Sequence, residues 1–141
     1  MTKRRSGREL AFRILFQCDV GALPLDEVLE TARERGEAAE ETWQFARELA
    51  VGSWQAHDEN DAIIQEYSSG WTLDRMPSAD RNILRLAVYE MTARDDIPRN
   101  VSINEAIELA KRYSTEDSPR FVNGILGALA RDRLQADVEG D

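Results

Sequence analysis

Residues 101–126 read VSINEAIELAKRYSTEDSPRFVNGIL, and this stretch decides the fold because it encodes two helices in immediate succession. Ser102 and Glu105 form an S-x-x-E capping box, in which each side chain satisfies a free backbone amide at a helix start. Ser118 followed by Pro119 marks a second start, because proline lacks the N–H that the first helical turn leaves unused. The stretch therefore predicts two amphipathic helices joined by a polar turn. Their apolar stripes are Ile103, Ala106, Ile107 and Ala110, and then Phe121, Val122, Ile125, Leu126 and Leu129.

Upstream of this stretch the helical spacing continues. A helix is predicted to begin at Ser78, and Glu90 lies inside its apolar arc. A buried carboxylate is costly unless it finds hydrogen-bond donors. We interpret Glu90 as a structural tie to the free amides at the start of the next helix, near residues 102–104, rather than as a catalytic acid. The apolar arc consists of Ala79, Ile83, Leu86, Ala87 and Met91.

The first half of the chain is also helical in pattern. We predict a helix starting at Ser6, a short helix over 25–35, one long helix over 40–67 and a single helical turn at 72–76. No segment alternates with period two for long enough to be a strand, so the fold class is all-α. The sequence Ser-Ser-Gly at 68–70 reads as a hinge between two halves.

This hinge divides the chain into three predicted parts. Residues 1–68 form an N-terminal helical subdomain that carries a basic arm, and residues 69–134 form a C-terminal helical subdomain. Residues 135–141 are acidic and aperiodic, which predicts a disordered tail.

The charge of the chain is strongly segregated. The net charge is −9, yet residues 1–13 hold five basic side chains against Glu9 alone, while the remaining residues are acidic in balance. Two interpretations stay open from the charge pattern itself: contact with a polyanion confined to the arm, or a solvated terminus. The basic side chains of the arm are Lys3, Arg4, Arg5, Arg8 and Arg13.

Composition excludes several classes of protein. No apolar run approaches the roughly 18 residues of a membrane span. Cys18 is the only cysteine and His57 the only histidine, so no disulfide framework, zinc site or Cys–His nucleophile pair is encoded. We expect no catalytic residues, no cofactor, no metal and a reducing cytoplasm. Trp43, Trp54 and Trp71 are interpreted as core anchors rather than stacking platforms.

Several quoted segments resemble the NusB family of bacterial transcription antitermination factors. These are NEAIELAK, EDSPRFVNGIL, WTLDRM, DRNILRLAVYEM and the basic start RRSGRELAFRILFQ. The resemblance implies an all-helical fold with seven helices in two packed subdomains. It also implies binding of boxA single-stranded RNA together with the ribosomal protein NusE. That complex helps RNA polymerase to read through terminators, notably in ribosomal RNA operons, and the family performs no chemistry.

The resemblance also assigns candidate sites position by position. Two departures from the family pattern are Ser6-Gly7, which suggests a more flexible arm, and Phe16, which lacks a hydroxyl often present there. The implied RNA-binding residues are Lys3, Arg4, Arg5, Arg8, Tyr67, Asp117, Arg120 and Phe121. The implied NusE-binding residues are Phe16, Asp74 and Asp80.

Two other functions compete with this one. One is the NusB-like RNA-binding module that is fused to bacterial ribosomal RNA cytosine methyltransferases, which would share the fold and the segregated charge. An acidic helical adaptor would bind only protein. Whether the free protein is a monomer or a homodimer also stays open.

Overall fold

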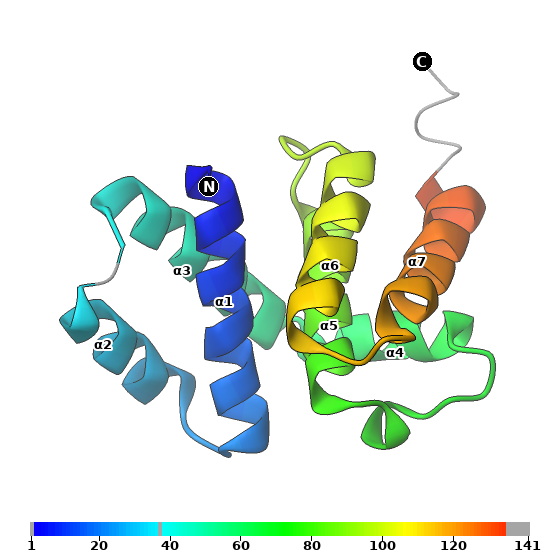
Figure 1. The fold of residues 1–141 in the computed structure, drawn as a ribbon, viewed down its shortest axis with the longest axis horizontal. Coiled ribbons are helices and arrows are strands. Elements are labelled where there is room, and N and C mark those ends of the chain that lie inside the picture. Colours follow the sequence, from blue (N-terminus) through cyan, green and yellow to red (C-terminus); the bar gives the residue numbers. More distant parts are fainter. Residues whose placement is uncertain (1, 37, 135–141) are drawn as a thin grey trace.

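The structure is a computed structural model that describes residues 2–36 and 38–134, and it is all-α as predicted (Figure 1). The described residues contain seven α-helices, two short helical turns of other types and no strand. The seven-helix prediction is therefore confirmed. The α-helices are α1 (Lys3–Val20), α2 (Leu25–Arg35), α3 (Glu40–Gln55), α4 (His57–Tyr67), α5 (Ser78–Ala93), α6 (Arg99–Tyr113) and α7 (Ser118–Leu129). The short turns are η1 (Leu73–Arg75) and η2 (Ala130–Leu134).

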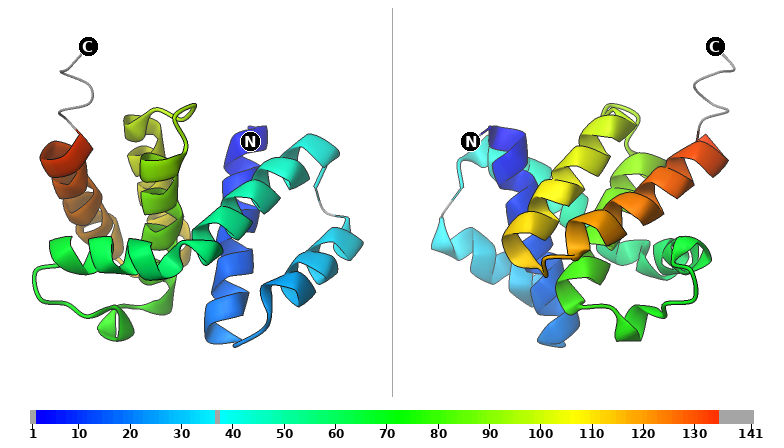
Figure 2. Two further views of the ribbon diagram at one scale, coloured as in Figure 1. Left: turned by 180° about the vertical axis from the view of Figure 1, so that it is seen from behind. Right: turned by 45° about the vertical axis from the view of Figure 1, so that its right-hand side comes forward.

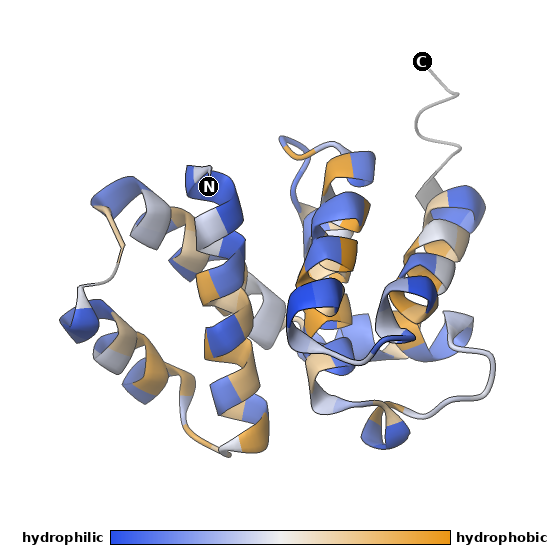
Figure 3. Ribbon diagram, viewed as in Figure 1, coloured by the Kyte–Doolittle hydropathy of each residue, from blue (hydrophilic) through white to orange (hydrophobic). Residues whose placement is uncertain are grey.

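Helix α5 is the centre of the arrangement. It packs against α1, α3, α4, α6 and α7, while α1, α2 and α3 pack against one another on one side (Figure 1). Side-chain ion pairs join α1 to α6 across a seam, through Arg5 with Glu105 and Arg112 with Glu9. Helix α7 packs along α6 (Figure 2). Every α-helix contributes apolar residues to the buried core. Figure 3 shows hydrophobic and hydrophilic residues interspersed along the helices. Large, fully buried members of this core include Leu15, Leu49, Ile64, Leu84 and Leu126.

Two helix starts differ from the prediction. Helix α1 begins at Lys3 rather than Ser6, because the Thr2 hydroxyl accepts a hydrogen bond from the Arg5 amide and caps the helix one turn earlier. Helix α6 begins at Arg99 after Pro98, so Ser102 lies inside the helix and does not form the predicted capping box. At α1 an upstream cap thus takes precedence over the S-x-x-E pattern, whereas α6 begins directly after Pro98, which makes no side-chain cap.

The long helix predicted over 40–67 is two helices. Helix α3 ends at Gln55, Ala56 lies between the helices with φ −95° and ψ 12°, and α4 begins at His57. The imidazole of His57 stacks on Trp54 with ring centroids 4.6 Å apart. The change of direction lets α4 pack against α5 and α7 rather than continue past them (Figure 2).

The position of α4 bears on the predicted subdomains. In sequence α4 belongs to the predicted N-terminal part, whereas in space it packs against α3, α5, α7 and η1. The division after residue 68 stays a prediction. The predicted acidic tail, 135–141, lies outside the described residues. None of the described helices combines the length and apolar character needed to cross a membrane.

Candidate nucleic-acid interface

The first two turns of α1 carry four of the five cations of the basic arm, and the three exposed ones among these four pair with carboxylates from three other segments. Lys3 Nζ lies 2.6 Å from a Glu41 carboxylate oxygen at the start of α3. Arg4 pairs with Asp96 at 3.1 Å, in the link between α5 and α6. Arg5 pairs with Glu105 on α6 at 3.0 Å. Any anion that binds these cations therefore competes with carboxylates of the protein itself.

These pairs shift the pKa values of the carboxylates. The hydrogen bond from the Arg94 guanidinium, and to a smaller extent that from Arg4, holds the pKa of the Asp96 carboxyl far below its ordinary range. The hydrogen bond from Lys3 likewise lowers the pKa of Glu41. Both groups are therefore fully charged at neutral pH. On the cationic side, the hydrogen bond to Glu105 raises the pKa of Arg5.

Arg8 differs from the other three cations because it is buried. Its side chain is 4% exposed, and its Nε donates to both carboxylate oxygens of Glu90, at 3.0 and 3.1 Å. The Ser102 hydroxyl donates to the same carboxylate at 3.0 Å. The predicted tie at Glu90 thus joins α5 to α6, through a hydroxyl rather than free amides, and also to α1. The burial of Arg8 does not fit the prediction that it contacts RNA phosphates, so we exclude it from the RNA-binding set.

Gly7 gives the physical reason for the Ser6-Gly7 departure. A Cβ atom at Gly7 would lie 2.7 Å from the Phe45 ring and 3.3 Å from the Thr42 carbonyl oxygen, both on α3. Glycine therefore lets α1 approach α3 closely. The arm is a continuous helix from Lys3 onward, docked on α3, and differs from the flexible arm that this departure suggested.

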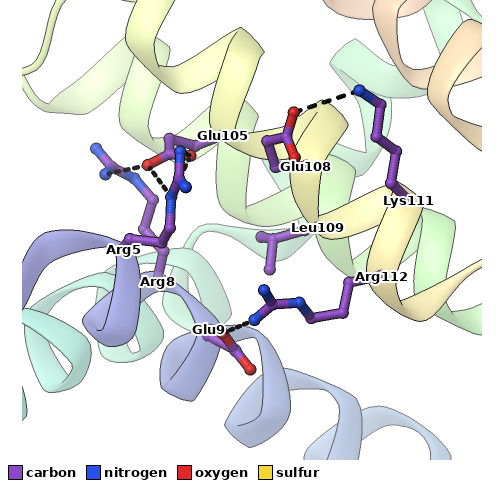
Figure 4. Close-up of a pocket in the computed structure, with 8 residues that line it drawn as sticks. All are labelled: Arg5, Arg8, Glu9, Glu105, Glu108, Leu109, Lys111 and Arg112. Carbon is purple, nitrogen blue, oxygen red and sulfur yellow. Dashed lines mark hydrogen bonds and ion pairs between the residues drawn. The ribbon is translucent and has the colours of Figure 1, made fainter. Parts of the chain in front are cut away.

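The seam between α1 and α6 contains a hollow of about 290 Å³, shown in Figure 4. At one end Arg5 and Arg8 converge on Glu105, and at the other Arg112 lies 2.7 Å from Glu9. Acidic and basic side chains alternate around an apolar floor at Leu109. The full lining is Arg5, Arg8, Glu9, Glu105, Glu108, Leu109, Lys111 and Arg112.

A second hollow, of about 240 Å³, lies where α6 turns into α7. Phe121 and Trp71 form two of its walls, with ring centroids 6.5 Å apart and planes at 72°. Asp117 stands exposed at its rim, and Asp80 lines it although that residue is only 2% exposed. We call this hollow the α6–α7 notch. Its lining residues are Trp71, Met76, Pro77, Asp80, Thr115, Asp117, Ser118 and Phe121.

Two predictions are corrected at this notch. Trp71 was expected in the core, yet it is 54% exposed, because its backbone sits in a tight turn after α4. Asp80 was expected on an acidic surface facing NusE, yet it is buried and accepts a hydrogen bond from the Ser114 hydroxyl. A carboxylate in that position does not offer an open acidic surface to a basic protein. Trp43, in contrast, is buried as predicted.

Arg120, Tyr67 and Phe16, three further predicted residues, line neither of these two hollows. Arg120 is exposed on the first turn of α7. Tyr67 lies at the end of α4, where its hydroxyl donates to Asp132 and accepts from Arg133, so it is tied to η2 rather than to the notch. Phe16 is half-buried on α1 against Phe12, with ring centroids 6.0 Å apart.

Asp74, the remaining predicted NusE contact, is exposed in η1. A hydrogen bond from Thr72 lowers the pKa of its carboxyl. It therefore keeps its negative charge at neutral pH and presents that charge at the surface.

The two hollows are separate, and none of the described residues lines both. Helix α6 connects them: Glu105 lies at the arm, and Thr115, just beyond its end, lies at the notch. At 1.5 Å per residue, Glu105 and the last residue of α6, Tyr113, are roughly 12 Å apart along the helix axis. The residues that sequence reasoning missed are the carboxylate partners Glu41, Asp96 and Glu105, because nothing local in the sequence pairs them with residues about 40 to 100 positions away.

Comparison with known proteins agrees with this fold. The NusB family model matches residues 5–131. The transcription antitermination protein NusB of Heliobacterium modesticaldum is 48% identical over 136 residues, which cover 96% of this chain and 66% of that protein. The NusB protein of Desulforamulus reducens is 46% identical over 133 residues, covering 94% of this chain and 93% of the relative.

Solved structures extend the match to three dimensions. T. maritima NusB aligns with a TM-score of 0.85 at 39% identity, covering 94% of this chain and 93% of that one. A crystal structure of the antitermination factors NusB and NusE in complex with dsRNA aligns with a TM-score of 0.83 at 26% identity, covering 93% of this chain and 98% of that one. The family model spans most of the chain, and these relatives are identical to it at nearly half of the aligned positions. The chain therefore belongs to the NusB family of transcription antitermination proteins.

Proposed function

We propose that this protein binds boxA-type single-stranded RNA together with NusE and supports processive transcription of ribosomal RNA operons by RNA polymerase. The observation that carries the proposal is the cluster of exposed cations Lys3, Arg4 and Arg5 on one end of α1, in a chain whose net charge is −9. An acidic body repels a transcript everywhere except at such a cluster. The related complex of NusB and NusE with dsRNA supports the same pair of partners.

The RNA path that we propose follows α6 from the arm to the turn before α7. Phosphates meet Lys3, Arg4 and Arg5 at one end, and Arg120 at the other. Between them, Lys111 and Arg112 on α6 are exposed beside the first hollow. Phe121, partly exposed at the notch, offers a ring for an unpaired base. Asp117 lies beside it as a hydrogen-bond acceptor.

The NusE side of the proposal uses Phe16 on α1 and Asp74 in η1. Phe16 supplies an apolar contact, and the exposed carboxylate of Asp74 suits a basic ribosomal protein, since opposite potentials speed encounter. The protein acts by binding rather than catalysis, and it acts in the cytoplasm, where transcription takes place.

Filter binding of boxA RNA with and without NusE tests the proposal. Alanine at Arg4 and Arg5 should weaken RNA retention and flatten its salt dependence, because fewer phosphates are neutralised by the protein. Arg35→Ala is the matched control, since Arg35 is an exposed cation on α2, away from the arm. Absence of RNA retention by the unchanged protein under both conditions would overturn the proposal in favour of a protein-binding adaptor.

A further inference from the structure

The two residues proposed to contact NusE lie on elements that are far apart in the sequence. Phe16 is on α1, a helix of the first twenty residues, and Asp74 is in η1, in the segment that joins α4 to α5. A single partner contacts both residues only when η1 is held in a fixed position relative to α1. The contact with NusE therefore depends on whatever side chain connects these two elements.

The segment that carries Asp74 has little anchorage of its own. Of residues 69–75, which the structure describes in full, six are exposed and Leu73 alone is half-buried. The helical turn η1 spans only Leu73–Arg75 and packs against α4. A segment with so few buried contacts opens at a small cost in free energy. The position of the Asp74 carboxylate therefore depends on what holds the backbone at Leu73.

Arg81, in the first turn of α5, holds that backbone. Its Nη1 donates to the Leu73 carbonyl oxygen at 3.3 Å, and its Nε donates to the Asp19 carboxylate at 2.6 Å. Asp19 lies three residues after Phe16 on α1, and this spacing places the two on the same side of the helix. Because a guanidinium is planar, its donors keep a fixed geometry. One side chain thus connects the residue before Asp74 to the helical turn that carries Phe16.

From this geometry we propose that Arg81 is a positioning residue for NusE binding. It holds η1 against the end of α1, so that Asp74 and Phe16 are presented to the same partner. This inference rests on the proposed function, and it adds a residue that acts through the placement of others. Its side chain is only 17% exposed, which suits a role inside the protein rather than in the contact itself.

The other donors to Asp19 make it possible to test this role apart from the packing of α1. Asn82 Nδ2 lies 2.8 Å and Arg85 Nη1 lies 3.3 Å from the same carboxylate oxygen. When Arg81 is replaced, Asp19 keeps these two partners, and the main loss is the hydrogen bond to the Leu73 carbonyl oxygen. Arg85 supplies the matched control, because it pairs with Asp19 and with a carboxylate of α4.

The test is a double-mutant cycle on the affinity of the full chain for NusE, measured by calorimetry. Asp74→Asn should weaken NusE binding to the otherwise unchanged protein. With Arg81→Gln already present, the factor lost through Asp74→Asn should be smaller by at least about twofold, because η1 no longer holds that carboxylate in place. Arg81→Lys should show the same reduced factor, since an ammonium lacks the fixed fork that holds both acceptors. With Arg85→Gln present, Asp74→Asn should cost its full factor.

RNA binding supplies a second readout that general loss of structure would move. In the absence of NusE, Arg81→Gln should bind boxA RNA as tightly as Arg85→Gln, which has the same net charge, because the arm lies at the other end of α1. The inference is overturned if Asp74→Asn costs the same factor in every background, or if Arg81→Gln weakens RNA binding as much as NusE binding. In both outcomes the proposed function stands.

Two further outcomes reach beyond this inference. If Asp74→Asn binds NusE as tightly as the unchanged protein, the proposed contact at Asp74 is wrong and the role of Arg81 falls with it, while RNA binding by the arm is unaffected. If the unchanged protein does not bind NusE, the proposed function itself is overturned.

Discussion

Glu90 is the residue on which the helical seam depends most directly. Its buried carboxylate joins Arg8 of α1 and Ser102 of α6 to α5. The sequence predicted a tie between helices at Glu90, because a carboxylate in an apolar arc needs donors. It did not predict Arg8 as a donor, because the two residues are 82 positions apart and no local pattern connects them.

Replacing Glu90 should therefore destabilise the whole protein. Glu90→Ala removes the carboxylate that accepts from Arg8 Nε and leaves the buried guanidinium with only Glu105, at 3.8 Å. Loss of one partner of a buried pair typically costs about 3–5 kcal/mol of unfolding free energy. Chemical denaturation measures the loss. The double variant Arg8→Met with Glu90→Leu should recover most of it, since a buried pair is often replaced by apolar side chains without penalty. A single variant as stable as the unchanged protein would contradict the structural role.

Asp19 provides a pH-dependent part of the stability. Burial raises the pKa of its carboxyl, but hydrogen bonds from Arg81 at 2.6 Å and Asn82 at 2.8 Å outweigh burial and lower that pKa overall. A carboxylate with a lowered folded-state pKa stabilises above its unfolded value of about 3.9 and loses that contribution as pH falls below it. Asp19→Asn should accordingly be less stable at pH 7 and show a smaller further loss of stability under acid. Urea denaturation at pH 7 and at about pH 3 would compare the two proteins; equal pH dependence would exclude Asp19 from this role.

At the scale of elements, the basic side chains of helix α1 form ion pairs with carboxylates of other elements. Glu41 of α3 and Asp96 of the α5–α6 link pair with Lys3 and Arg4, and these pairs are exposed to solvent. An exposed pair contributes about 0.2–1 kcal/mol, so phosphate can displace it. We therefore expect these carboxylates to lower the affinity for RNA while leaving the cations available to phosphate.

Removing those carboxylates should strengthen RNA binding. Asp96→Asn and Glu41→Gln are each expected to increase affinity for boxA RNA by a few-fold, because each removes a carboxylate that competes with phosphate for a cation of the arm. Glu34→Gln is the matched control because it removes an equal charge from an exposed position on α2. If Asp96→Asn and Glu41→Gln bind RNA no more tightly than Glu34→Gln does, the ion pairs of the arm do not affect RNA affinity, and only the net charge of the protein does.

The ends of the helices show which sequence signals were sufficient to predict where a helix begins or stops. Helix α2 has the predicted bounds, because Pro24 and Gly36 flank it and Gly36 adopts φ 60° at its end. The break at Ala56 was missed because no proline or glycine marks it, and tertiary packing of α4 decides it instead. The α6 start was misplaced because Pro98 and the S-x-x-E box at Ser102 compete within one turn.

For the whole molecule, the fold class and family were predictable, whereas the grouping of site residues was not. Helical periodicity runs through nearly all of the chain, so the all-α fold follows from local pattern alone. The distribution of Arg8, Asp80 and Trp71 between core and surface depends on contacts between distant segments. For that reason the sequence did not show that the residues implied in RNA binding lie at two separate places, the start of α1 and the hollow where α6 turns into α7.

The position of α5 at the centre has a consequence for dynamics. Every side chain from Asn82 to Val88 is buried, so for two turns this helix has no face toward water. Amide protons in such a segment exchange with deuterium mainly when the entire chain opens, whereas those at helix ends exchange through local fraying. Exchange rates at 82–88 should therefore be the slowest in the described residues and should report global stability. Slowing of these amides when RNA and NusE are added would measure how much free energy the partners contribute to holding the molecule closed.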